Sequence, residues 1–251
     1  MKTIKTVLIA ALLAPVLAWA AGAELHLDKA PDKTGDQLAL QHGAKLFVNY
    51  CLNCHGASYM RYNRMTDIGL TDDQIRQNLM FTAEKVGEPM TTAIRPAEAK
   101  QWFGAPPPDL SVIARSRASE FGSGADWLYT YLRSFYRDPS RPTGWNNTVF
   151  ENVGMPHALW QLQGIQDVQV EKTKDAAGHE VEHKKLVLTQ PGSMTPQQYD
   201  AAVADLVSFL VYIGEPAAAT RKQLGVWVLI ALGILFVLSF ALKKNFWKDV
   251  H

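Results

Sequence analysis

The sequence predicts a mainly α-helical domain with loop insertions and one β-hairpin, followed by a single C-terminal transmembrane helix. Apolar residues recur at helical spacing in several segments of the 251-residue chain. Alternation of apolar and charged or polar residues is confined to residues 165–188, which predicts an exposed hairpin. The nineteen uncharged residues 224–242 span about 28 Å as a helix, which is enough to cross a bilayer.

Helices are predicted where apolar residues at helical spacing are bounded by capping residues and by residues that end helices. Thr71 and Thr195 are typical N-caps, and Thr195 is followed by a proline at the first helical position and a glutamine at the third. Consecutive prolines fit neither a helix nor a central strand, so residues 104–108 form a rigid extended wall. The helices are expected at 38–50, 72–80, 109–118, 126–135 and 196–213.

The N-terminus is typical of a secretory signal peptide over residues 1–20. Lys2 and Lys5 form a positive region, residues 7–17 are apolar, and Ala18-Trp19-Ala20 matches a cleavage site. An N-terminal membrane anchor is the alternative, but the apolar run is short and contains a proline. We therefore expect residues 21–220 to form one exported domain.

The C-terminal apolar run predicts an anchor helix over residues 221–243 and a short tail over 244–251. A buried core helix is disfavoured because the run is apolar on every face. Lysines follow it, which predicts a cytoplasmic tail, although two basic residues on the other flank weaken the asymmetry and the signal peptide decides the orientation. The formal net charge is +1 and no basic block is present, so no nucleic-acid partner is predicted.

The motif Cys51-Leu52-Asn53-Cys54-His55 carries the chemistry. C-x-x-C-H indicates covalent attachment of c-type haem, because each thiol can add to a vinyl group and the histidine can bind the iron. A redox dithiol is one alternative, but such a site follows a buried strand, and the preceding residues have helical spacing. A zinc site would need two further ligands. These are the only two cysteines, so the motif uses every thiol in the chain.

The second axial ligand decides what a haem could do. Methionine opposite histidine fills the coordination sphere and favours electron transfer, whereas an open sixth position favours gas binding or peroxide chemistry. Met155 is the methionine that we favour from its surroundings, since Gly154 allows close approach of the backbone and Pro156 stiffens the segment. The residues alone leave the choice open. The other candidates are Met60, Met65, Met80, Met90 and Met194, and less favourably His157, His179 and His183.

These motifs resemble the cytochrome c1 family, the membrane-anchored haem subunits of the ubiquinol–cytochrome c reductase (bc1) complex. The resemblance depends on the haem motif, on Pro107-Pro108-Asp109-Leu110-Ser111 with Arg115 and Arg117 after it, on Gly154-Met155-Pro156 and on the C-terminal anchor. It covers nearly all of the chain after residue 20. The haem motif is common to all c-type cytochromes, and its combination with the other features is more specific.

The resemblance implies a class I cytochrome c fold with one covalent haem c and with His55 and Met155 as iron ligands. It implies that Pro107 and Leu110 line the haem, and that Arg115 or Arg117 pairs with a haem propionate, which a guanidinium can bind through two hydrogen bonds. Some members have an additional disulfide, which this chain lacks the cysteines to form. The 165–188 hairpin matches no role in the family.

The function that the resemblance implies is a one-electron relay in a bacterial respiratory chain. The chain would accept electrons from a Rieske iron–sulfur protein beside cytochrome b and pass them to a soluble or membrane-tethered cytochrome c, within a dimeric complex. The domain would be periplasmic, on a single-pass anchor in the inner membrane. Three alternatives remain: a haem enzyme or gas sensor with an open sixth site, a structural or assembly protein, and a haem subunit of another complex such as an oxidase.

Overall fold

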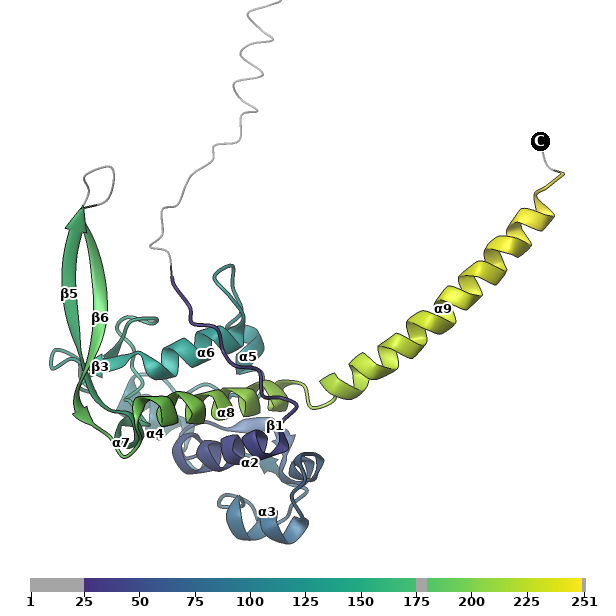
Figure 1. Ribbon diagram of the computed structural model, residues 1–251. Helices are drawn as coiled ribbons and strands as arrows, with labels where there is room; N and C mark the ends of the chain where they lie inside the picture. Colours follow the sequence, from purple (N-terminus) through teal and green to yellow (C-terminus); the bar gives the residue numbers. More distant parts are fainter. Residues whose placement is uncertain (1–24, 175–179, 250–251) are drawn as a thin grey trace, which may run out of the picture.

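The computed structural model describes residues 25–174 and 180–249, so the predicted signal peptide lies outside the described residues. The body contains more helix than strand, and the strands of the described residues occur only in pairs (Figure 1). In chain order the helices are α2 (Gln37–Leu46), the π-helical turn η1 (Phe47–Cys51), the 3₁₀ helix η2 (Tyr62–Ile68), α3 (Asp72–Asn78), α4 (Pro96–Phe103), α5 (Ile113–Ser116), α6 (Gly124–Arg133), α7 (Trp160–Gln163), α8 (Pro196–Gly214) and α9 (Ala218–Phe246).

The strands of the described residues form three antiparallel pairs. They are β1 (Ala57–Arg61) with β2 (Pro89–Met90), β3 (Phe135–Arg137) with β4 (Trp145–Asn147), and β5 (Gly164–Lys174) with β6 (Glu180–Pro191). The predicted fold class, a mainly α-helical domain with a hairpin and a C-terminal apolar helix, is confirmed.

The core forms where α2 crosses α8. A Cβ atom at Gly43 of α2 would lie 2.3 Å from the carbonyl oxygen of Asp205, so only glycine allows the two helices to approach this closely. Phe47 and Phe209 pack beside the crossing with ring centroids 5.7 Å apart, and both are fully buried. Burying such an aromatic ring stabilises the fold by about 2 kcal/mol or more. This crossing holds the helix that leads into the cysteine motif.

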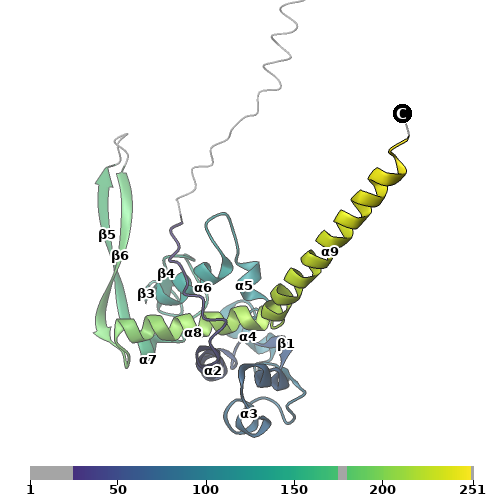
Figure 2. The same ribbon diagram turned by 45° about the vertical axis from the view of Figure 1, so that its right-hand side comes forward.

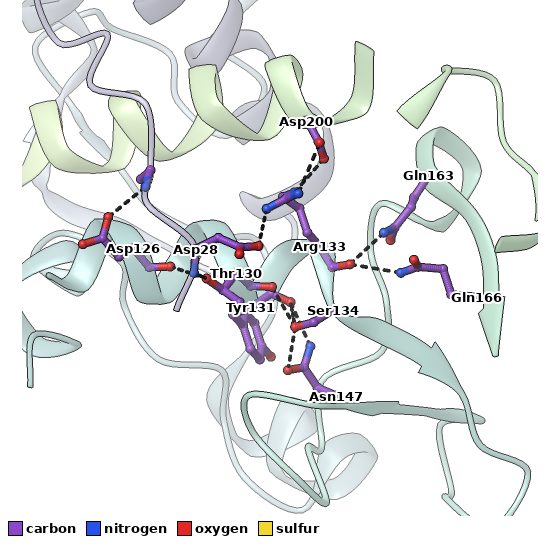
Figure 3. Close-up of polar contacts among 11 residues, drawn as sticks. Asp28, Asp126, Thr130, Tyr131, Arg133, Ser134, Asn147, Gln163, Gln166 and Asp200 are labelled. Atoms are coloured by element: carbon purple, nitrogen blue, oxygen red, sulfur yellow. Dashed lines mark hydrogen bonds and ion pairs between the residues drawn. The ribbon is translucent and has the colours of Figure 1, made fainter. Parts of the chain in front are cut away.

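Arg133, at the end of α6, joins four parts of the chain (Figure 3). Its Nε donates to Asp200 on α8 at 2.6 Å, and its Nη1 donates to Asp28 of the N-terminal segment at 2.7 Å. Its carbonyl oxygen accepts hydrogen bonds from the side chains of Gln163 and Gln166, at 2.9 and 3.0 Å. The half-buried guanidinium is therefore paired with two carboxylates, one from the N-terminal segment and one from α8. This network fixes α6 against α8 and the base of the hairpin.

The β5–β6 hairpin projects from the body, as both views show (Figures 1 and 2). The strands pair from Gly164 opposite Pro191 to Lys174 opposite Glu180. Gly164 has φ of +94°, and a Cβ there would lie 2.1 Å from the carbonyl oxygen of Gln190, so glycine is required where the hairpin leaves the body. The predicted hairpin is confirmed, with its turn at 175–179 outside the described residues.

Helix α9 also stands away from the body (Figure 2). It has 29 residues and a mean hydropathy of 2.6 in its most apolar window, and none of that window is buried. Among the described residues it is the one helix long and apolar enough to cross a membrane. It begins before and ends after the predicted span of 221–243, so the first residues assigned to the tail are helical.

Several element boundaries differ from the prediction. The helix expected at 109–118 is only the single turn α5, because the carboxylate of Asp109 bonds to Ser58 and Ser111 instead of capping a helix. The helix expected at 126–135 is α6, which begins earlier because Ser123 and Asp126 form a capping box. Helix α4 and the β3–β4 pair have no counterpart among the predicted elements. The helices expected at 72–80 and 196–213 are confirmed as α3 and α8, with Thr71 and Thr195 as their N-caps.

Candidate haem-binding site

The cysteine motif lies where the first helix ends. The π-helical turn η1 ends at Cys51, whose carbonyl oxygen accepts from the N–H groups of Cys54 and His55 at 3.0 and 2.8 Å. The next loop is fixed by Thr92, whose hydroxyl donates to the carbonyl oxygen of Asn53 at 2.8 Å. Both cysteines are half-buried and free of any disulfide. The two sulfurs and the imidazole therefore belong to residues of one short turn.

The thiols do not have the properties of a redox dithiol. Burial raises the pKa of Cys51 to about 12, with a further contribution from Cys54, and burial raises the pKa of Cys54 as well. A thioredoxin-type site needs the opposite, a thiol whose pKa is lowered so that thiolate is present. No group of three or more His, Cys, Asp or Glu side chains suited to a metal ion occurs in residues 25–174 and 180–249.

His55 is held in one tautomer by a backbone carbonyl. Its Nδ1 lies 2.8 Å from the carbonyl oxygen of Pro108, and since that oxygen can only accept, Nδ1 carries the hydrogen. The Nε2 lone pair is therefore available to a metal ion, and the hydrogen bond makes the imidazole a stronger ligand. Burial lowers the pKa of His55, which keeps the ring in the neutral form that binds metals. The sequence places Pro108 in the run that carries the family resemblance, but no sequence pattern connects its carbonyl to His55.

The Pro-Pro-Asp-Leu-Ser run is attached to the strand that follows the motif. Asp109 Oδ2 accepts from the N–H and hydroxyl of Ser58 at 2.8 and 2.7 Å, and Asp109 Oδ1 accepts from the N–H of Ser111 at 2.8 Å and from its hydroxyl. The Leu110 N–H donates to the carbonyl oxygen of Gly56 at 2.7 Å, immediately after His55. Leu110 is buried in the core. These contacts set the position of the Pro108 carbonyl, and half-buried Pro107 precedes it.

Met155 lies in a cluster of aromatic side chains from α6. The Tyr131 hydroxyl donates to Met155 Sδ at 3.3 Å, and the Tyr131 ring stacks on Trp127 with centroids 4.7 Å apart. Met155 is half-buried. A Cβ at Gly154 would meet only the carbonyl oxygen of Phe103, at an ordinary 3.6 Å. The packing within the protein therefore does not require a glycine at 154.

The other candidate ligands have different surroundings. Met60, Met65 and Met90 are fully buried core residues, and Met80 and Met194 pack against that core. His157 is buried between Phe135 and Trp145, and its Nε2 has no hydrogen-bond partner among the described residues. It remains the rival to Met155. His179 and the side chain of His183 lie outside the described residues.

The two arginines point to different places. The Arg117 guanidinium lies over the Trp127 ring at 4.5 Å from its centroid, in the cluster that contains Tyr131 and Met155. Arg115 instead donates to Glu215 at 2.5 Å and lines a cavity of about 1130 Å³ beside the start of α9. The structure thus brings Arg117 into the Met155 group and separates Arg115 from it.

The residues fit a c-type haem in their chemistry. Two thiols and an imidazole with a free Nε2 lone pair form one group, with the Pro107–Ser111 run beside them. A thioether, aromatic rings and a guanidinium form the second group. They are the donor types that attach haem c, coordinate its iron and neutralise a carboxylate.

Comparisons with known proteins agree with this chemistry. A model of the cytochrome c1 family matches residues 27–250. The chain is 50% identical to a Nitrosomonas europaea protein named ammonia monooxygenase gamma subunit, over the full length of both. It is 46% identical to cytochrome c1 of Allochromatium vinosum, over 96% of each chain. It is 27% identical to cytochrome c1 of Rhodospirillum rubrum, over 86% of this chain and 83% of that one.

Proposed function

Because this chain belongs to the cytochrome c1 family, we propose that it relays single electrons from a Rieske iron–sulfur protein to a soluble or membrane-tethered cytochrome c. Family membership gives it a covalently bound haem c and the role of a membrane electron-transfer subunit of the bc1 complex. Its C-terminal apolar helix fits the membrane anchor. The chain is a subunit of a ubiquinol–cytochrome c oxidoreductase rather than an enzyme by itself.

The observation that carries this proposal is the hydrogen bond from His55 Nδ1 to the Pro108 carbonyl. It leaves the Nε2 lone pair available to a metal ion, in a residue that lies one position after Cys54 and four after Cys51. A redox dithiol would have no use for a histidine fixed in this tautomer. The donor set therefore supports a haem c electron carrier more directly than the other readings of the motif.

Each residue has a distinct part in the proposal. Cys51 and Cys54 would attach the haem, and His55 and Met155 would bind its iron. Haem c supplies a one-electron Fe(III)/Fe(II) couple, whose potential is raised when methionine lies opposite histidine. With both side chains bound to the iron, gas or peroxide would find no free position. No residue needs to act as an acid, base or nucleophile.

The surrounding residues adjust that couple. Arg117 is the proposed propionate partner, because its guanidinium lies in the Met155 group while Arg115 is paired with Glu215 near the anchor. Pro107 and Leu110 border the His55 side, where the Leu110 N–H holds the backbone just after the motif. A guanidinium beside a carboxylate in a partly buried site neutralises it and favours the reduced, less positive iron.

We propose that the domain lies in the periplasm, with α9 crossing the inner membrane once beside cytochrome b and the Rieske protein in a dimeric complex. The length and apolar character of α9 support the anchor, and the lysines at its C-terminal end support a cytoplasmic tail. Such an anchor keeps the carrier next to its electron donor.

The experiment is purification of the complex through a tag on this chain, after mild solubilisation of the membranes. We expect cytochrome b and the Rieske protein to copurify in stoichiometric amounts, and a quinol to reduce the c-type haem. Copurification with the subunits of an oxidase, with no quinol-driven reduction, would overturn the proposal.

The Nitrosomonas europaea relative suggests a second candidate, because its name places that protein in an ammonia monooxygenase. For this chain, the candidate predicts copurification with monooxygenase subunits and loss of ammonia oxidation when the gene is deleted. Deletion under the proposed relay function would instead abolish quinol-dependent reduction of cytochrome c. The two outcomes are measured on the same membranes.

A further inference from the structure

The hydroxyl of Tyr131 is bonded to the sulfur of Met155 rather than to another oxygen. The Oη–Sδ distance is 3.3 Å, and since a thioether has no hydrogen to give, the hydroxyl is the donor. Tyr131 is a buried residue of α6, and Met155 is half-buried in a loop twenty-four residues later. A buried tyrosine hydroxyl usually finds a hydrogen-bond partner, and here that partner is a thioether sulfur.

The ring that carries this hydroxyl is held on two sides. It stacks on Trp127 with centroids 4.7 Å apart and planes 14° apart, and it meets Phe135 edge-on at 5.0 Å. These contacts fix the plane of the ring and therefore the direction in which the hydroxyl points. Figure 3 shows the ring extending from α6 on the side opposite α8.

The backbone of Tyr131 is tied to the segment that leads to Met155. Fully buried Asn147 donates its Nδ2 to the Tyr131 carbonyl at 2.8 Å (Figure 3). Its Oδ1 accepts from the N–H groups of Val149 and Phe150 at 2.9 and 3.2 Å. One amide thus joins the donor helix to the start of the methionine loop. The hydroxyl and the sulfur therefore lie on a shared support and not on two independent surfaces.

A hydrogen bond to a thioether changes what the sulfur can give to a metal. Sulfur has two lone pairs, so one can bind iron while the other accepts a hydrogen bond. Donation from a hydroxyl withdraws electron density from the sulfur, and Fe(III) needs that density more than Fe(II) does. The reduced state is then favoured, in the way that hydrogen bonds to axial ligands adjust haem potentials.

We propose that Tyr131 is a positioning residue that holds Met155 Sδ through its hydroxyl and raises the reduction potential of the haem. The proposal rests on the proposed function, since it requires Met155 as the axial ligand. It assigns a role to a residue that no sequence motif identified, and it explains why α6 places an aromatic cluster beside the methionine loop.

The test is Tyr131→Phe in the full-length haem-loaded protein, which keeps both ring contacts and removes only the hydroxyl. A redox titration followed by haem absorbance gives the midpoint potential. At a fixed ambient potential we expect the ratio of ferric to ferrous haem to rise about three- to tenfold, a fall in midpoint of about 30 to 60 mV at ~59 mV per tenfold change. Tyr129→Phe is the control: it removes a hydroxyl from the same helix, where the ring lies under the Arg133 guanidinium, and should leave the midpoint unchanged.

The far-red charge-transfer band of methionine bound to ferric iron distinguishes failure of the proposed Tyr131 role from failure of Met155 as a ligand. If the wild type has the band and Tyr131→Phe leaves the midpoint where it was, the role of Tyr131 is wrong while Met155 ligation stands. If the wild type lacks the band, Met155 is not a ligand and the proposed function fails first.

A second replacement keeps the proposal testable if Tyr131→Phe incorporates no haem. Difluorotyrosine at position 131 keeps the ring and hydroxyl and donates a stronger hydrogen bond, so the midpoint should rise. An unchanged or lowered midpoint in that protein would contradict the proposal, whatever the fate of the phenylalanine variant.

Discussion

Asp109→Ala tests how the chain holds its proximal histidine. The carboxylate accepts four hydrogen bonds, two from Ser58 after the haem motif and two from Ser111. Removing it should release the Pro-Pro-Asp-Leu-Ser run from the strand, and with it the Pro108 carbonyl that fixes His55. The substitution therefore acts on the iron ligand from a residue that does not touch it.

The magnitude follows from the number and exposure of these bonds. A net hydrogen bond is worth about 0.5 to 1.5 kcal/mol, and water can replace part of each one because Asp109 is exposed. Taking the lower end for all four gives a loss of about 2 kcal/mol in the free energy of unfolding. The midpoint potential should also rise, because an imidazole that loses its carbonyl acceptor is a weaker donor to Fe(III), and a negative charge is removed nearby.

The assay is denaturant unfolding of the purified holoprotein in detergent, followed by haem absorbance, with a redox titration of the same sample. Asp138→Ala is a matched control, since Asp138 accepts from Ser140 and Asn146 in the β3–β4 region. It should destabilise the fold without moving the potential. If Asp109→Ala unfolds within about 0.5 kcal/mol of the wild type and keeps its potential, the run does not position His55.

Three further predictions concern Arg117, Gly154 and Asp126. Arg117→Gln should lower the midpoint potential in a redox titration while Arg115→Gln leaves it unchanged, because only Arg117 lies in the Met155 group; equal shifts would contradict this assignment. Gly154→Ala should leave the thermal stability of the protein nearly unchanged, since its Cβ meets only Phe103 at 3.6 Å, yet weaken the far-red methionine band; loss of fold with an intact band would refute it. Burial raises the pKa of Asp126, but hydrogen bonds from neighbouring N–H and hydroxyl groups outweigh this effect and hold the pKa below its usual value. The carboxylate therefore stabilises the fold above pH ~4. This contribution disappears as the pH falls through the folded-state pKa. Acid unfolding of Asp126→Asn should therefore depend less on pH below ~4 than that of the wild type, and identical slopes would contradict the assignment.

The sequence predicted those helices and strands that are specified by residues inside the element or directly beside it. Helix α8 has its N-cap, proline and glutamine within four residues, and the structure forms the capping box that they predict. The hairpin follows from alternation alone, and α9 from apolar length. In each case the residues that specify the element lie inside it or at its ends.

The errors occurred where long-range contacts decide the structure. Asp109 resembles a helix cap in the sequence, but Ser58, which lies fifty-one residues earlier, accounts for two of its hydrogen bonds. No local pattern could reveal this partner.

Some residues of the candidate site can be predicted from the sequence, and others cannot. The covalent motif and the Gly154-Met155-Pro156 segment are readable from sequence because their chemistry is contained in adjacent residues. The Pro108 carbonyl and the Tyr131 hydroxyl are not, since each acts through a contact made only in the folded chain. Only the fold decides between Arg115 and Arg117 as the propionate partner. The two residues are close in the sequence, but their side chains contact different partners.

The most direct test of the account is the optical spectrum of the purified haem-loaded chain, recorded oxidised and reduced, for the wild type and for Met155→Leu. The account predicts a far-red methionine band in the oxidised wild type, no binding of carbon monoxide, and loss of the band with gain of carbon monoxide binding in the variant. A wild type that lacks the band and binds carbon monoxide would indicate an open site and contradict the relay. A wild type that lacks the band and excludes carbon monoxide would indicate ligation by His157 instead.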